Sequence, residues 1–425
     1  MSTSATTSDS HSASAEASTA ASAAVFELAA GLNFVFDELE SDVHLGDQIQ
    51  YHLEQLCDEA EKYPGSMLHD GVGEEWPCSP GMSELLRATC RCASMVYEQT
   101  QDLGAKGFEI EPLLHRPPSS MGTVKASSMW KIPFIPMPEW AGKTLVVSIR
   151  GTASVADHMV NMNDRSKGTG ALFRNVEAHA GFLGCAEAML ATISQDIQQQ
   201  FDADDKIYNV VFTGHSAGGA VASLVFLRFL FQQTQNPWVL KNRLSLVTFG
   251  SPPVVNSSIT SLCKEQPNAG LVLSLVNEYD MVSRADRPYL RSIVDLYRSR
   301  RGLPLKYPQM GETAPDPDIW PLPPPTLRVV GDIIILQRPR LVGMPSASDG
   351  DSFSQASTLV APTYPAVKLT EEEFSKLLFC DTSVHRRRAY LDRVETLAAQ
   401  SCEDCISKET GPEAWKLGNA LIFSS

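Results

Sequence analysis

Residues 206–233 read KIYNVVFTGHSAGGAVASLVFLRFLFQQ. The first part, KIYNVVFTG, is a short apolar run of the kind found in strands buried within a sheet. The part from Ser216 onward opens with small residues and is long enough for a helix packed closely on that sheet. The stretch therefore predicts a strand, a sharp turn and a helix.

Three other apolar runs predict buried strands, at residues 144–150, 243–251 and 271–277. A helical pattern over residues 82–97 precedes them. Because strands alternate with helices along the chain, we expect a parallel sheet with crossover helices. The predicted fold class is α/β.

The ends of the chain differ in composition from its middle. Residues 1–22 are nearly all Ser, Ala and Thr, and we expect them to form a disordered tail because they cannot bury enough apolar surface. Apolar residues recur at helical spacing over residues 25–43, so an N-terminal helical extension is predicted at residues 23–80. The main domain is expected at residues 81–400, followed by a C-terminal tail at residues 401–425.

The last third of the chain carries two further patterns. Residues 326–337 predict a hairpin with a tight turn at Gly331 and Asp332. One helix is expected to start near Thr370, which EEEF follows, and another to cover residues 385–400.

Charge and cysteine usage exclude several classes of protein. The formal net charge of -15 repels phosphate backbones, so nucleic acid is not an expected partner. Nine scattered cysteines do not imply a complete disulfide framework. Cys402 and Cys405 have no second pair or following histidine, so we interpret them as incidental and expect no metal and no other cofactor.

The sequence shows no targeting or membrane-spanning pattern. The N-terminus lacks the basic and apolar regions of a secretory signal, and no apolar run approaches the roughly 18 residues of a spanning helix. We therefore expect a soluble, cytoplasmic protein.

The predicted sharp turn carries Gly214, His215, Ser216, Ala217 and Gly218. This is the G-x-S-x-G pattern of a nucleophile elbow, in the strand-to-helix setting that the pattern requires. Glycine on either side removes side chains that would collide with neighbouring elements at such a strained turn. The serine hydroxyl then stands exposed as a nucleophile, and the Ala217 N–H can face a developing oxyanion.

A serine hydroxyl is a weak nucleophile until a base takes its proton. In elbow-bearing α/β folds the acid and then the histidine follow the serine along the chain. Of nine histidines, only His385 follows Ser216, so it is the predicted base. The alternative is that His385 belongs to a solvated charge cluster with the arginines at residues 386–388.

The acid is less determined, because fifteen carboxylates lie between the serine and the histidine. Asp280 is the best candidate, since it follows the strand at residues 271–277 at the end where α/β sheets build their sites. Glu278, Asp286 and Asp332 remain competitors. A turn or helix cap is the alternative role for Asp286, and the predicted hairpin turn is the alternative for Asp332.

A second oxyanion donor is expected after an earlier strand. Gly151 follows the strand at residues 144–150 and lets the chain turn toward the nucleophile. Thr152 then offers both a backbone N–H and a hydroxyl, so Thr152 and Ala217 are the predicted oxyanion hole.

Five motifs occur in order: VVSIRGTASVADHMVNMNDR, AHAGF, VVFTGHSAGGAVASL, LVTFGSPPV and LVNEYDMVSR. Together they resemble the class 3 (fungal-type) lipase family of α/β-hydrolases, over about residues 85–395. The resemblance implies an α/β-hydrolase fold and a triad of Ser216, Asp280 and His385. It also implies that Thr152 and Ala217 form the oxyanion hole.

The resemblance further implies a mobile amphipathic lid at about residues 154–170, and an ordinary surface helix is the alternative there. Relatives often carry a tryptophan after the lid aspartate, whereas this chain has His158 after Asp157.

The expected activity is hydrolysis of mono- or diacylglycerols or related lipid esters through an acyl-serine intermediate. The expected partners are a lipid or small-molecule ester and, transiently, a membrane or lipid-droplet surface. The alternatives are a phospholipase, a carbohydrate esterase on the same fold, or a catalytically silent binding or signalling module.

Overall fold

The structure is a computed structural model. It describes residues 56–97, 110–118, 125–135, 137, 142–151, 169–173, 175–231, 238–300, 302, 304–305, 316–338 and 365–409. The predicted tail at residues 1–22 and the helical pattern at residues 25–43 lie outside the described residues.

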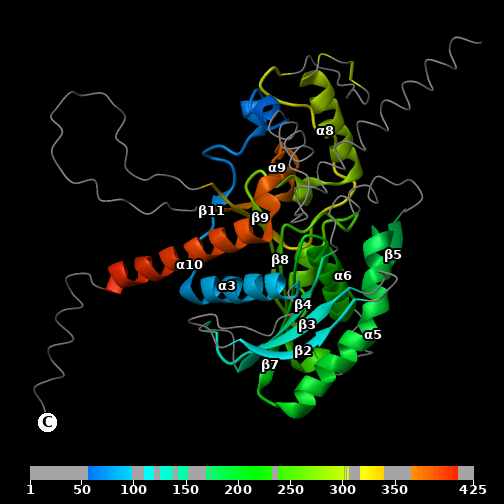
Figure 1. Ribbon diagram of the computed structural model, residues 1–425, viewed down its shortest axis with the longest axis vertical. Helices are drawn as coiled ribbons and strands as arrows, with labels where there is room; N and C mark the ends of the chain where they lie inside the picture. Colours follow the sequence, from blue (N-terminus) through cyan, green and yellow to red (C-terminus); the bar gives the residue numbers. More distant parts are fainter. Residues whose placement is uncertain are drawn as a thin grey trace, which may run out of the picture.

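Within the described residues, nine strands form one sheet in the order β1-β11-β10-β9-β8-β7-β4-β3-β2 (Figure 1). Their bounds are Glu74–Glu75 (β1), Glu111–Arg116 (β2), Ser127–Ile132 (β3), Lys143–Ile149 (β4), Ile207–His215 (β7), Arg243–Phe249 (β8), Ala269–Asn277 (β9), Asp332–Leu336 (β10) and Ala366–Leu369 (β11). Strands β4, β7, β8, β9 and β10 pair in parallel, and antiparallel strands complete both edges. The four strands predicted from apolar runs are confirmed as β4, β7, β8 and β9.

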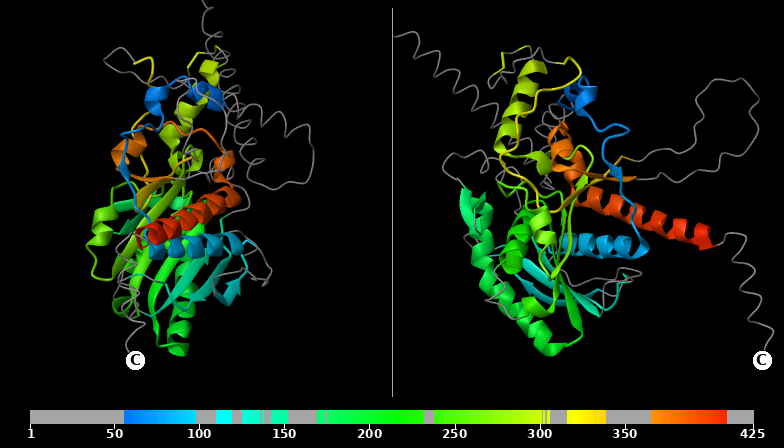
Figure 2. Two further views of the ribbon diagram at one scale, coloured as in Figure 1. Left: turned by 90° about the vertical axis from the view of Figure 1, so that its left-hand side faces the viewer. Right: turned by 180° about the vertical axis from the view of Figure 1, so that it is seen from behind.

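Helices cover both faces of the sheet. Helices α5 (Ala180–Ala203) and α6 (Ala217–Phe231) pack together against one face. Helices α3 (Pro80–Met95) and α10 (Arg387–Glu409) lie side by side on the other (Figures 1 and 2). The helix predicted at residues 82–97 is α3.

Alternate side chains of the central strands enter two separate cores, as the two-residue period of a strand requires. Val147 and Phe212 join the core under α5 and α6, whereas their neighbours Val146 and Val211 join the core under α3 and α10. Because both faces are buried, these strands are apolar at nearly every position. The fold is an α/β-hydrolase fold, with a mostly parallel sheet between two helical layers.

The predicted hairpin at residues 326–337 is wrong. Strand β10 pairs in parallel with β9, and its antiparallel neighbour β11 comes from residues much later in the chain. Gly331 has φ of 111°, and a Cβ there would lie 2.7 Å from the Val272 carbonyl oxygen. Because Gly331 has no side chain, the chain can approach β9 closely there and begin β10 beside it. No hairpin turn forms at this position.

The two helices predicted near the C-terminus are present. Helix α9 (Glu371–Ser375) begins with a capping box, in which the Thr370 hydroxyl accepts from the Glu373 N–H and the Glu373 carboxylate accepts from the Thr370 N–H. Helix α10 continues past its predicted end at residue 400.

Shorter elements connect these parts. They are η1 (Pro64–Ser66), η3 (Val239–Lys241), α7 (Thr260–Lys264), η4 (Met281–Arg284), α8 (Arg287–Arg300), η5 (Ser383–His385) and a two-stranded sheet of β5 (Thr169–Phe173) and β6 (Val176–His179). None of the described helices combines the length and apolarity needed to cross a membrane.

The described part of the N-terminal segment packs on the main domain. Strand β1 pairs with β11 at the sheet edge. Before β1 in the same segment, the Ser66 carbonyl accepts from the Leu378 N–H at 2.8 Å. The neighbouring Gly65 N–H donates to the Asp318 carbonyl at 2.8 Å. The segment thus holds the chain that leads from α9 toward His385.

Candidate active site

Ser216 occupies the turn between β7 and α6 in a strained backbone conformation. Its φ is 58°, a left-handed value that non-glycine residues rarely adopt. Its N–H donates to the carbonyl of Phe249, the last residue of β8, at 2.9 Å. The surrounding sheet therefore fixes the strained turn, which is the geometry of a nucleophile elbow.

Gly214 and Gly218 allow the elbow to pack against itself and against β4. A Cβ on Gly214 would lie 2.4 Å from the Gly218 carbonyl carbon. A Cβ on Gly218 would lie 2.2 Å from the Ile149 carbonyl oxygen and 2.7 Å from the Gly151 nitrogen. No side chain fits at either position without moving backbone.

The hydroxyl of Ser216 lies at the amino end of α6. The side chain is buried, and its oxygen makes no hydrogen bond to any described residue. Helix α6 starts at Ala217, so the Ala217 N–H belongs to a first turn whose N–H groups have no acceptor within the helix. An oxygen atom at this point can therefore accept a backbone hydrogen bond and lie at the positive end of the helix dipole.

Asp280 and His385 form a fully buried pair. The His385 Nδ1 lies 2.8 Å from the Asp280 Oδ2, and both side chains have 0% exposure. Because a carboxylate can only accept, the Nδ1 carries a hydrogen, so the lone pair of the neutral ring lies on Nε2. This is the tautomer that a histidine needs to act as a base.

Two further donors hold the Asp280 carboxylate. The Tyr390 hydroxyl donates to Oδ2 at 2.6 Å, and the Val282 N–H donates to Oδ1 at 2.9 Å. The Asn277 N–H donates to the Tyr390 hydroxyl at 2.9 Å, and the Asn277 side chain donates to the Val384 carbonyl at 2.7 Å. The end of β9 therefore holds both the carboxylate and the residue before His385.

His215 joins the elbow to the His385 loop. Its Nε2 donates to the His385 carbonyl oxygen at 2.7 Å, and the two imidazole rings lie 4.7 Å apart. Burial holds the pKa of His215 well below its ordinary value of 6.5, and charge on His385 lowers it further. His215 is therefore neutral, and its single ring N–H is committed to the loop that carries His385.

The three predicted catalytic residues converge at the carboxyl end of β8. A Cβ on Gly250 would lie 2.9 Å from the His385 Cε1 and 3.0 Å from the Asp280 Oδ2. Gly250 directly follows Phe249, whose carbonyl holds the Ser216 N–H. The structure brings the Asp280 and His385 pair beside the elbow, but the Ser216 hydroxyl makes no hydrogen bond to the imidazole.

The competing carboxylates are engaged elsewhere. Asp286 caps the start of α8 through Tyr289 and accepts from the N–H of Thr326, which is the turn or cap role considered for it. Glu278 accepts from the Arg338 N–H. Asp332 makes ion pairs with lysines and takes no part in a hairpin turn.

The predicted oxyanion loop is described only at its start. Thr152 and residues 154–168 of the predicted lid lie outside the described residues. At Gly151, the N–H donates to the Tyr97 hydroxyl at 2.9 Å. No group of three or more His, Cys, Asp or Glu side chains within the described part of the chain could hold a metal ion.

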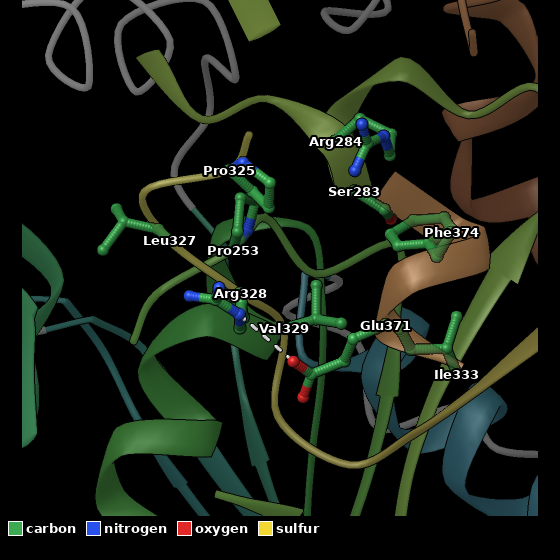
Figure 3. Close-up of a pocket in the computed structure, with 10 residues that line it drawn as sticks. All are labelled: Pro253, Ser283, Arg284, Pro325, Leu327, Arg328, Val329, Ile333, Glu371 and Phe374. Carbon is green, nitrogen blue, oxygen red and sulfur yellow. Dashed lines mark ion pairs between the residues drawn. The ribbon is translucent and has the colours of Figure 1, made fainter. Parts of the chain in front are cut away.

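A small pocket lies between the segments after β8 and β9, the chain that leads into β10, and α9 (Figure 3). Pro253, Leu327 and Phe374 are among its apolar lining residues, and Figure 3 shows the ion pair between two other lining residues, Arg328 and Glu371. Its described lining includes none of the three predicted catalytic residues.

Three residues in or beside the site were not predicted as site residues. Tyr390 follows His385 closely in the sequence, but the sequence does not show that its hydroxyl contacts Asp280. Asn277 carries a local signal, as a polar residue at the end of an apolar strand. Tyr97 carries none, because its partner Gly151 is far away in the sequence.

Comparisons with known proteins agree with the five ordered sequence motifs. The family described as "Lipase (class 3)" matches residues 146–289. A secreted mono- and diacylglycerol lipase of Fusarium solani is 33% identical over 134 residues, which cover 30% of this chain and 36% of that protein. A lipase of Rhizopus niveus is 35% identical over 118 residues, covering 27% and 28%. The chain thus spans about a third of the length of the curated relatives it matches.

Solved fungal lipase structures are also similar. The Rhizomucor miehei lipase–propeptide complex has 18% identity, a TM-score of 0.36, and coverage of 51% of this chain and 71% of that one. Lipase II of Rhizopus niveus has 18% identity, a TM-score of 0.37, and coverage of 50% and 76%. The family match agrees with the ordered motifs: residues 146–289 of this chain are similar to the class 3 lipase family.

Proposed function

We propose that the protein is a serine hydrolase that cleaves carboxylic esters of lipid-like substrates through an acyl intermediate on Ser216. The observation that carries the proposal is the strained Ser216 elbow beside a fully buried His385 and Asp280 pair. Structural residues rarely combine a left-handed serine with a histidine held in the basic tautomer.

In the first step, the Ser216 oxygen attacks the ester carbonyl carbon while the Nε2 of His385 takes the hydroxyl proton. Among the described residues, no group forms a hydrogen bond with this hydroxyl. Asp280 accepts from the Nδ1 and stabilises the imidazolium that forms. His385 then gives the proton to the departing alcohol.

The carbonyl oxygen becomes negative in this step and needs donors aimed at it. The Ala217 N–H at the start of α6 is one, and the second comes from Thr152 in this proposal. Water then attacks the acyl-serine, with His385 again acting as base, and releases the acid.

The proposed substrates are mono- or diacylglycerols. Support comes from the Fusarium solani relative, which is named a mono- and diacylglycerol lipase. Transient contact with a lipid surface is part of the proposal. The cytoplasmic location stays a prediction from the sequence.

The nucleophile is tested with a fluorophosphonate probe, which labels activated serines. Wild-type protein should take up one probe per chain and hydrolyse p-nitrophenyl esters. Ser216→Ala should lose the label and lower turnover by roughly 10⁴-fold or more. The control Ser223→Ala removes a hydroxyl of α6 that bonds only within its own helix, and it should keep both signals. Label or turnover retained in Ser216→Ala contradicts the proposal.

The base and the acid are tested by comparing how much turnover each substitution removes. His385→Ala should lower turnover by several orders of magnitude, and Asp280→Asn by less. A panel of acylglycerols, phospholipids and acetylated sugars then separates the substrate classes. A correctly folded wild type that binds the acylglycerols but takes up no probe is the catalytically silent alternative.

A further inference from the structure

Tyr97 lies at the end of the turn that follows α3, and its hydroxyl reaches two segments of the site. The hydroxyl accepts from the Gly151 N–H at 2.9 Å. It also donates to the carbonyl oxygen of His215, the residue before the nucleophile, over a long 3.5 Å. One side-chain oxygen thus connects the turn that leaves β4 with the elbow.

The three groups are packed without space between them. A Cβ on Gly151 would lie 2.4 Å from the Tyr97 hydroxyl, 3.2 Å from the His215 carbonyl oxygen and 3.3 Å from the Gly218 nitrogen. The backbone at Gly151 therefore lies directly against the elbow. The Tyr97 hydroxyl oxygen occupies the space that a side chain at Gly151 would otherwise need.

Two cations hold the ring of Tyr97, one from the β4 turn and one from the start of α10. The guanidinium of Arg387, two residues after His385, lies 4.2 Å from the ring centre, and that of Arg150 lies 5.2 Å from it. The Arg387 side chain also donates to the Ser94 carbonyl at the end of α3. Tyr97 therefore contacts the β4 turn, the elbow and the start of α10.

The hydroxyl keeps its proton at neutral pH. Burial raises the pKa of Tyr97, while the charges of Arg387 and Arg150 and the Gly151 hydrogen bond lower it less. A protonated phenol can accept from one backbone group and donate to another at the same time.

We propose that Tyr97 is a positioning residue for the reaction, holding the β4 turn at Gly151 at a fixed distance from the elbow at His215 and Ser216. The inference rests on the proposed ester hydrolysis. An oxyanion forms beside the Ala217 N–H and the chain leaving β4, and its stabilisation depends on donors fixed before the reaction. Loss of the tether should therefore slow the chemical step more than it weakens substrate binding.

The test compares Tyr97→Phe with the control Tyr208→Phe in the full chain. Tyr97→Phe keeps the ring and its arginine contacts and removes only the oxygen. Tyr208 is half exposed at the opposite end of β7, away from the site. With p-nitrophenyl butyrate, Tyr97→Phe should lower kcat about 10- to 100-fold and change KM by less than about threefold. Tyr208→Phe should match the wild type.

The pH dependence and amide exchange separate positioning from general damage. The pH at which kcat/KM falls on the acid side should be the same in Tyr97→Phe and wild type, because the His385 and Asp280 pair is untouched. Hydrogen exchange at the Gly151 amide should become faster in Tyr97→Phe alone. A kcat within twofold of wild type, a shifted acid side or unchanged exchange each overturns the inference.

Failure of the proposed function is visible separately. If wild-type protein shows neither fluorophosphonate labelling nor turnover, the proposed hydrolysis fails, and the positioning role fails with it. If wild-type protein is active and Tyr97→Phe equals it, only the positioning role fails.

Discussion

The two halves of the site are built in different ways. The elbow is a run of five consecutive residues, and its shape follows from contacts that only glycine permits. The histidine half joins residues 105 to 110 positions apart, through bonds of Asp280 to His385 and Tyr390. Steric exclusion therefore shapes the first half, and a chain of buried hydrogen bonds shapes the second. The four substitutions below test that difference, beginning with the largest expected effect.

Gly218→Ala should break the elbow. Its Cβ would lie 2.2 Å from the Ile149 carbonyl oxygen, so β4 or α6 must move. We expect a loss of about 3 kcal/mol in the free energy of unfolding and at least a 10²-fold loss of turnover. Urea unfolding and esterase assays measure both.

The matched control is Gly184→Ala, in the interior of α5. A Cβ at Gly184 would meet no atom within 4 Å. That change should stabilise the protein by about 0.5–1 kcal/mol, because alanine favours a helix over glycine. Equal effects at the two glycines would show that close contact does not shape the elbow.

Tyr390→Phe should weaken the histidine half. It removes the donor to the Asp280 Oδ2 and the acceptor of the Asn277 N–H. We expect about 1–3 kcal/mol lower stability and about tenfold lower kcat. Tyr289→Phe is the control, because its buried hydroxyl also donates to one backbone group and accepts from another, both of Phe379, away from Asp280. The control should lose similar stability and keep its kcat, and an equal loss of kcat in both would refute a specific role for Tyr390.

His215→Gln should flatten the dependence of stability on pH. The folded pKa of His215 is well below 6.5, so below pH 6.5 the unfolded chain binds a proton that the folded chain refuses. Stability is therefore lost as pH falls through 6.5. This loss is about 1.4 kcal/mol from about pH 7.5 to about pH 5.5, and glutamine removes it while keeping a donor for the His385 carbonyl.

Urea unfolding at the two pH values measures the slope. Burial raises the pKa of Asp286, which acts in the opposite sense, but this group is present in both proteins and cancels in the comparison. An identical slope in His215→Gln and wild type would mean that His215 takes up its proton in the folded protein.

Glu395→Gln should have the smallest effect. The Arg91 Nε donates to the Glu395 carboxylate at 2.7 Å and so links α3 to α10, but both side chains are partly exposed. We expect a loss of about 0.2–1 kcal/mol that shrinks at high salt. A loss well above about 1 kcal/mol, or one that high salt leaves unchanged, would contradict the description of this contact as a screened surface ion pair.

The sequence predicted the regular part of the fold well. Strands β4, β7, β8 and β9 are apolar runs because helices cover both faces of the sheet, and that pattern is local. The sharp turn at Ser216 follows from two glycines at fixed spacing. The order of serine, acid and histidine narrowed the base to His385, which the structure brings to Asp280.

The remaining features depend on contacts that no local pattern carries. The run before Gly331 looked like one arm of a hairpin, but β10 finds its antiparallel partner beyond a long insertion. The Asp280 partners Tyr390 and Val282 could not be assigned, because spacing does not show which donors a buried carboxylate meets. Tyr97 reaches Gly151 only because α3 lies against the sheet.

The short strand β1 affects how far the chain can be trimmed from its amino end. Glu74 and Glu75 cap the backbone of β11, and Ser66 restrains the chain near Leu378 on the way to His385. A version beginning at Pro80 would leave β11 with bare amide and carbonyl groups that can recruit the same strand of another molecule. Such a shortened protein should self-associate on storage and lose turnover together, although every proposed reacting group is still present.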